Sequence, residues 1–193
     1  YPDAVGVALF MAYEQALEQI RTKHPQHERS AVSLLDALSL LAASGVPTHW
    51  LLALDNDSTS IRDTLSFLKK SSTLQESADG DKTIIHRLQG QVYRETYLSN
   101  QEKLGEASVC AVTILNGIDI DQLELFEQQR QETHNLVEQI GAITPQNHSR
   151  PLFYDPDFVA ILATTLRNAT DLGMPQLALT LTDSVTRAGD TLG

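Results

Sequence analysis

The side chains that most often carry acid–base, nucleophilic or metal chemistry are few in this chain, which has six histidines and one cysteine. His24 and His27 stand three residues apart but flank Pro25, so they do not share one turn of helix. Cys110 lies in an apolar Val-Cys-Ala-Val run, which is typical of a small core residue and not of a nucleophile. These patterns predict no catalytic residue and no metal site.

Glycine-rich motifs that hold phosphates are absent from the sequence, as is the Gly-x-Ser-x-Gly turn that presents the nucleophile of many hydrolases. We therefore expect no cofactor and no enzymatic activity. The alternative is an enzyme whose catalytic residues come together only in three dimensions.

The charge balance narrows the classes of partner. The formal net charge is −11 and the pI is near 4.8. Because phosphate backbones and anionic lipid headgroups repel an acidic surface, nucleic acid is not an expected ligand. A protein or peptide partner is expected, and basic partners are favoured by charge.

Two features bear on the compartment. A single cysteine cannot form a disulfide within the chain, which fits a reducing compartment such as the cytoplasm. No stretch approaches the roughly 18–20 apolar residues that a membrane-spanning helix needs, so we expect no direct membrane insertion. A soluble domain of a membrane protein is the alternative.

Apolar residues recur at three- and four-residue spacing along most of the chain, which predicts amphipathic helices. The Leu-rich helix that begins near Ser30 is apolar on most sides, so we place it at the centre of its lobe. Asp155-Pro156 predicts a helix start, with an N-cap and then proline at the first helical position. The predicted helices cover, approximately, residues 3–23, 30–44, 47–54, 60–70, 82–99, 107–115, 119–140, 155–172 and 174–188.

The predicted fold class is all-α, with about eight helices and no convincing strand. Residues 1–70 and 82–141 show a similar order of helices and gaps, which predicts two similar helical lobes. Residues 71–81 are polar and contain Asp79-Gly80, so they predict a linker with a turn. Residues 142–193 are expected to form a C-terminal helical pair that packs on the lobes.

This plan resembles the Clp N-terminal repeat domain, which precedes the AAA+ motors of Clp-type unfoldases. The matching segments are residues 12–17 (Ala-Tyr-Glu-Gln-Ala-Leu), 33–38 (Ser-Leu-Leu-Asp-Ala-Leu), 44–48 (Ser-Gly-Val-Pro-Thr), 116–123 (Asn-Gly-Ile-Asp-Ile-Asp-Gln-Leu) and 155–173. Ala31-Val32-Ser33 stands where the family has Thr-Glu-His before the leucine run. The resemblance implies a recognition domain for adaptors or unfolding substrates, without catalysis, and no adaptor-site residue is carried over.

Large aromatic residues give the most concrete candidate binding site. Trp50 lies at the expected tip of the first lobe, and Tyr93, Tyr97 and Leu98 lie in one long predicted helix. We expect a groove between the lobes, lined by these four residues, to bind protein. The alternative is that they are ordinary core residues. The expected function is a non-catalytic protein-interaction domain of a larger assembly, and the alternative is a helical scaffold.

Overall fold

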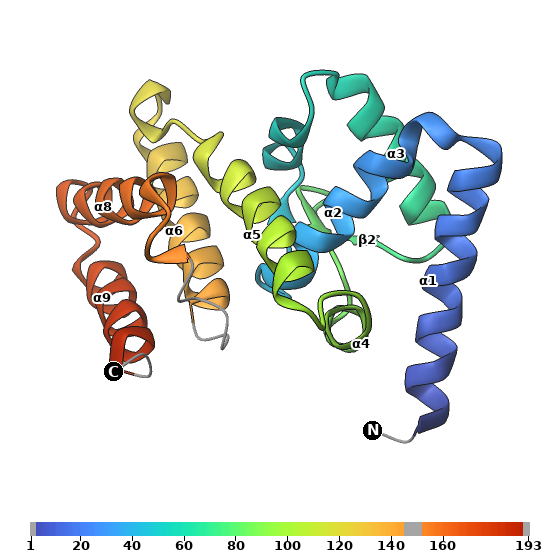
Figure 1. The fold of residues 1–193 in the computed structure, drawn as a ribbon. Helices are drawn as coiled ribbons and strands as arrows, with labels where there is room; N and C mark the ends of the chain where they lie inside the picture. Colours follow the sequence, from blue (N-terminus) through green and yellow to red (C-terminus); the bar gives the residue numbers. More distant parts are fainter. Residues whose placement is uncertain (1–2, 145–151, 191–193) are drawn as a thin grey trace. The chain divides into compact units, whose positions relative to one another are not determined.

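The protein is all-α in a computed structural model that describes residues 3–144 and 152–190 (Figure 1). Eight α-helices lie in these ranges, as the helical periodicity predicted. The chain forms two compact units, Tyr1–Ile114 and Leu115–Gly193. Residues 1–70 and 82–114, which were expected to belong to separate lobes, therefore lie in one unit.

The first unit is built around α2 (Glu28–Leu40), which packs against α1 (Asp3–Lys23), α3 (Ser58–Lys70) and α4 (Arg87–Tyr97). Every side chain of α2 from Leu34 to Leu40 is buried, because its apolar residues occupy most of its circumference. Short 3₁₀ turns, η1 (Pro25–His27) and η2 (Trp50–Leu54), lead into and away from this region. The central place predicted for the Leu-rich helix is thus confirmed within this unit.

A small antiparallel sheet in the same unit corrects two sequence expectations. Its strands are β1 (Val46–Pro47), β2 (Gln75–Glu76) and β3 (Lys82–Ile84), in the order β1-β3-β2. No strand had been predicted, and residues 82–84 had been assigned to a helix. Strands of two or three residues are too short to show an alternating pattern. The expected linker 71–81 contains β2 and the turn into β3, where Gly80 has a φ of +80°.

Several helix limits also differ from the predicted ones. α3 was predicted to begin at residue 60 but begins at Ser58, and it is capped by Asp57, whose carboxylate accepts the Thr59 amide. α5 (Gln101–Asn116) includes Gly105 and begins well before residue 107, where this helix was predicted to start. The added Cβ of an alanine at Gly105 would meet nothing within 4 Å, so no close packing requires a glycine there.

The second unit contains the turn η3 (Ile120–Gln122) and three mutually packed helices, α6 (Phe126–Ile143), α8 (Pro156–Asp171) and α9 (Pro175–Asp190). Asp155 caps α8 by accepting the amides of Asp157 and Phe158, as predicted. Gly173, with a φ of +66°, turns the chain into α9, which gives the expected C-terminal helical pair. The helix predicted to begin at 119–121 begins at Phe126, because Asp119 caps η3 instead. Apart from Thr144, the loop expected at 144–150 lies outside the described residues.

We predict that Gly45→Ala destabilises the first unit much more than Gly80→Ala. Both glycines have positive φ, but a Cβ at Gly45 would lie 2.8 Å from Ile84 Cγ1, whereas one at Gly80 would meet open space. Backbone strain costs about 1 kcal/mol at either site, and the clash should bring Gly45→Ala to about 2–4 kcal/mol. Urea unfolding followed by the fluorescence of Trp50, the only tryptophan, measures both. Equal losses would contradict the close packing of Gly45 on β3.

Candidate functional site

The two halves of α1 differ in what they present to solvent. In the carboxyl half, Tyr13, Ala16, Leu17 and Ile20 are buried against the unit, and the opposite face is polar. In the amino half, residues 4–12 carry no charged or hydrogen-bonding side chain at all. A helix that is apolar on every side is normally buried, yet Val7 is 55% exposed and Met11 63% exposed. This half of α1 therefore exposes apolar surface that the fold of the first unit does not bury.

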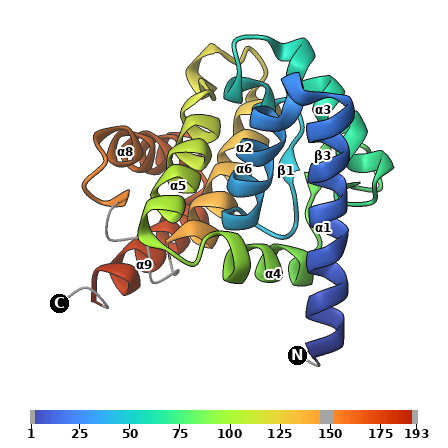
Figure 2. The ribbon, with the colours of Figure 1, turned by 45° about the vertical axis from the view of Figure 1, so that its right-hand side comes forward.

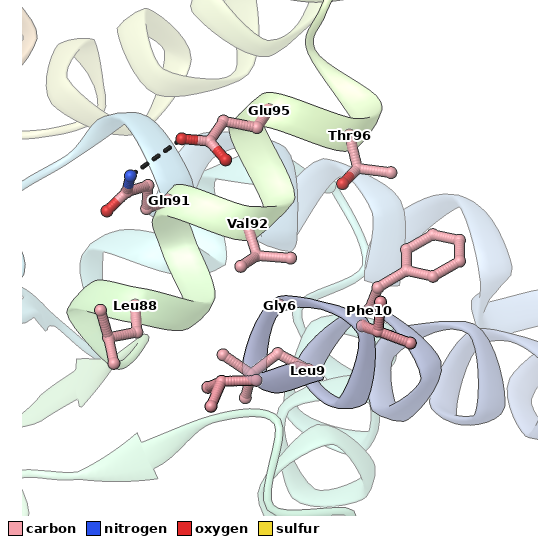
Figure 3. Close-up of a pocket in the computed structure, with 10 residues that line it drawn as sticks. Gly6, Leu9, Phe10, Leu88, Gln91, Val92, Glu95 and Thr96 are labelled. Carbon is pink, nitrogen blue, oxygen red and sulfur yellow. Dashed lines mark hydrogen bonds between the residues drawn. The ribbon is translucent and has the colours of Figure 1, made fainter. Parts of the chain in front are cut away.

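The amino half of α1 extends beyond α2 and α3, and α4 crosses it (Figures 1 and 2). Between α1 and α4 lies an open groove with a volume of about 490 Å³. Leu88 and Leu9 lie at one end of this groove, and Thr96 and Phe10 lie at the other (Figure 3). Its lining residues are Val5, Gly6, Val7, Leu9 and Phe10 of α1 and Leu88, Gln91, Val92, Glu95 and Thr96 of α4.

The floor of this α1–α4 groove is apolar and its edge is polar. Val92 points from α4 toward α1 beside Gly6, where an added Cβ would meet nothing within 4 Å (Figure 3). Among the lining residues that the structure describes, Glu95 is the only charged one, and its carboxylate accepts a hydrogen bond of 2.8 Å from the Gln91 amide. An apolar floor with a few polar groups at the edge is the usual composition of a binding surface for a helix.

Polar contacts to α2 fix the position of α4. The buried Tyr93 hydroxyl donates a hydrogen bond of 2.8 Å to Asp36 Oδ1, and the Arg94 guanidinium donates to the Ser39 carbonyl. Gly90 is buried on the same side, and a Cβ there would come within 4.0 Å of Ser39 Cα. These contacts leave the opposite flank of α4 free to line the groove.

Burial raises the pKa of Asp36, and the hydrogen bond from Tyr93 counteracts part of that rise. Burial also raises the pKa of Tyr93, so its phenol is neutral and remains a donor at physiological pH. The ring of Tyr93 contacts Tyr13 edge-on at 5.4 Å and Tyr97 at 4.7 Å, and Tyr97 in turn lies 6.0 Å from Phe10. A line of rings thus connects the buried carboxylate to the end of the groove.

The four residues expected to bind protein are mostly core. Trp50, Tyr93 and Leu98 are 2%, 1% and 4% exposed, which matches the alternative that the sequence also allowed. Tyr97 is half-buried and is the one whose ring contacts a groove residue, Phe10. Val5, Val7 and Val92 line the groove but were not among the residues predicted from the sequence. The apolar run at residues 4–12, which no polar residue interrupts, could have indicated Val5 and Val7 from the sequence.

The chemistry-bearing side chains are used in structural contacts. His27 Nδ1 lies 3.3 Å from Ser60 Oγ, which lies 3.4 Å from Ser30 Oγ, which in turn lies 3.5 Å from Asp55 Oδ2. In this chain of contacts the carboxylate orients a hydroxyl and not the imidazole, so it lacks the order of a catalytic relay. Within residues 3–144 and 152–190, no group of three His, Cys, Asp or Glu residues has metal-binding geometry.

Cys110 is half-buried, where the sequence had favoured a buried core residue. Burial raises the pKa of its thiol, which keeps it protonated and weakly nucleophilic at neutral pH. Together with the hydroxyl and carboxylate contacts above, this leaves the α1–α4 groove as the strongest candidate site in the described part of the chain.

Comparison with protein-family models, with curated proteins and with solved structures finds no match to this chain. Of the helices in the described ranges, none has the length and apolar character to cross a membrane.

We predict that Tyr93→Phe lowers the free energy of unfolding by about 1.5–3 kcal/mol at neutral pH, because the buried Asp36 carboxylate loses its donor. Without that bond the pKa of Asp36 rises further above its ordinary value in the folded state. The loss is therefore largest above this raised pKa and shrinks as the pH falls through it and Asp36 takes up a proton.

Tyr97→Phe is the matched control, because its hydroxyl bonds to Glu14 at an exposed position. It should cost less than about 1 kcal/mol. Trp50 fluorescence in urea, measured from about pH 4 to 8, compares the two variants. A Tyr93→Phe loss that is small, or that grows as the pH falls, would contradict this role for Asp36.

Proposed function

We propose that the protein is a non-catalytic protein-interaction domain that binds an amphipathic helix of its partner in the α1–α4 groove. The observation that carries this proposal is the apolar amino half of α1, which is exposed although no residue from 4 to 12 is polar. Burial of apolar surface supplies about 25 cal/mol per Å², so covering this half of α1 together with Leu88 and Val92 favours association. The groove is open to solvent, as a helix-in-groove contact requires.

Charge selects among such partners. The chain carries a net charge of −11, and Glu95 is the one charged side chain among the described residues that line the groove. A helix with lysine or arginine beside its apolar face is attracted to this surface, and an acidic helix is repelled. We therefore propose a basic amphipathic partner, with association that weakens as salt is added.

The likeness to the Clp N-terminal repeat domain gives the proposal its most specific form. In that form the partner is an adaptor or an unfolding substrate, and the groove delivers it to a Clp-type ATPase within a larger assembly. The arrangement of α1 and α4 supports only the binding step. The delivery step depends on the resemblance, which is carried by leucine- and alanine-rich segments.

We predict that a photoreactive benzoylphenylalanine in place of Val7 forms a covalent adduct with a discrete protein in intact cells. Val5→Asp should reduce the yield of this adduct more than about tenfold, because an unpaired carboxylate in the covered groove costs at least about 2 kcal/mol. An aspartate in the first turn of α1 is favourable to the helix itself, so α1 should stay folded.

Gln15→Asp is the control, since it adds the same charge to an exposed position of α1 outside the groove. It should leave the adduct in place. The proposal fails if no adduct forms, or if Val5→Asp and Gln15→Asp leave equal amounts of it. Denaturing electrophoresis and mass spectrometry of the adduct measure the outcome.

A further inference from the structure

We infer that one end of the α1–α4 groove is a cation-recognition subsite, formed by Phe10, Tyr97 and Glu14, that accepts a lysine or arginine of the bound helix. This inference rests on the proposed function, because it names the partner chemistry at the same groove. It depends on two contacts and on the charge balance at the end of the groove where Phe10 and Thr96 lie (Figure 3).

The first contact joins the two helices through their rings. Phe10 of α1 and Tyr97 of α4 are half-buried, with centroids 6.0 Å apart and ring planes tilted by 36°. Both residues stay partly exposed, although Tyr97 also packs on Tyr93, and the electron-rich faces of aromatic rings attract ammonium and guanidinium groups. The long apolar stem of lysine or arginine can meanwhile lie along the groove floor.

The second contact places a carboxylate beside these rings. Glu14 follows Phe10 by four residues, so the two side chains are neighbours on one face of α1. The Tyr97 hydroxyl donates a hydrogen bond to Glu14 Oε1, which ties this carboxylate to the ring pair. A ring pair with an adjoining carboxylate combines both attractions that a cationic side chain seeks.

The third observation is that the nearby cations are used elsewhere. Arg21, farther along α1, pairs with Glu18 and Glu28 at 2.9 Å each. Arg94 of α4 is turned to the Ser39 carbonyl. Within the described residues, neither Glu14 nor Glu95 forms an ion pair, although Arg94 attracts Glu95 at longer range, so Glu14 is the carboxylate at this end of the groove without a close internal counterion.

The distance between the subsite and the apolar floor of the groove predicts the spacing of apolar and cationic residues in the bound helix. Val5 and Phe10 are five residues apart on α1, which corresponds to about 7.5 Å along the helix axis. A bound helix should therefore carry apolar residues three or four apart over Val5, Leu9 and Val92, with lysine or arginine one further turn away. An uncharged helix and a second copy of this chain are the competing occupants.

Selection of a phage-displayed random peptide library on the full chain tests this pattern. We expect the selected peptides to share the apolar pair and a lysine or arginine one turn from it. Fluorescence polarisation then gives the Kd of the best peptide and of the same peptide with norleucine in place of its cation. The norleucine peptide should bind about fivefold more weakly.

Glu14→Gln completes a double-mutant cycle, since glutamine keeps an acceptor for Tyr97 but removes the charge. This substitution should weaken binding of the cationic peptide several-fold and leave binding of the norleucine peptide unchanged. If peptides depend on Val5 but bind equally with cation or norleucine, the subsite is overturned and the groove stands. If the Val5→Asp variant still binds every selected peptide, the proposed function fails as well. If the chain forms a dimer that Val5→Asp dissociates, the groove is assigned to a second copy of the chain and the subsite is overturned as well.

Discussion

The docking of α4 on α2 is the constraint on which the candidate site depends. Tyr93 and Arg94 satisfy the Asp36 carboxylate and the Ser39 carbonyl from one flank of α4, and Gly90 lets the two helices approach. A buried carboxylate is costly unless it is hydrogen-bonded, so the Tyr93–Asp36 bond favours this one seating of α4 over a slipped alternative. With that flank fixed, Leu88 and Val92 on the other flank must face α1, and the groove follows.

The two halves of α1 differ in what they contact, and the groove depends on this difference. The carboxyl half of the helix packs on the unit and is polar outside, as a surface helix of a stable domain should be. The amino half adds apolar surface that the unit itself leaves uncovered. Several residues with reactive groups show the opposite pattern, because Asp36 accepts a hydrogen bond from Tyr93, and Ser60 contacts both His27 and Ser30. These groups make structural contacts, whereas the amino half of α1 leaves apolar surface exposed.

Local patterns in the sequence predicted local structure well and the site poorly. The 3.6-residue period identified most of the helices, and Asp155-Pro156 located the start of α8, because these signals act within one or two turns. The four candidate binding residues were chosen as large aromatic and apolar side chains, but size favours the core as strongly as it favours an interface. Strands of two or three residues carry no period. The contacts that build the groove join residues 57 and 83 positions apart, Asp36 with Tyr93 and Glu14 with Tyr97, and no local pattern encodes them.

The central claim is that the amino half of α1 is covered by a partner in the cell, and methionine oxidation tests it most directly. In a Val7→Met variant the introduced thioether lies in the groove lining, at a position that is 55% exposed in the wild type, and Met174, half-buried before α9, is the internal reference. Mass spectrometry after a brief peroxide pulse gives the ratio of oxidation at position 7 to oxidation of Met174 in intact cells and in the purified variant. A ratio at least severalfold lower in cells is the predicted result, and equal ratios would contradict the account.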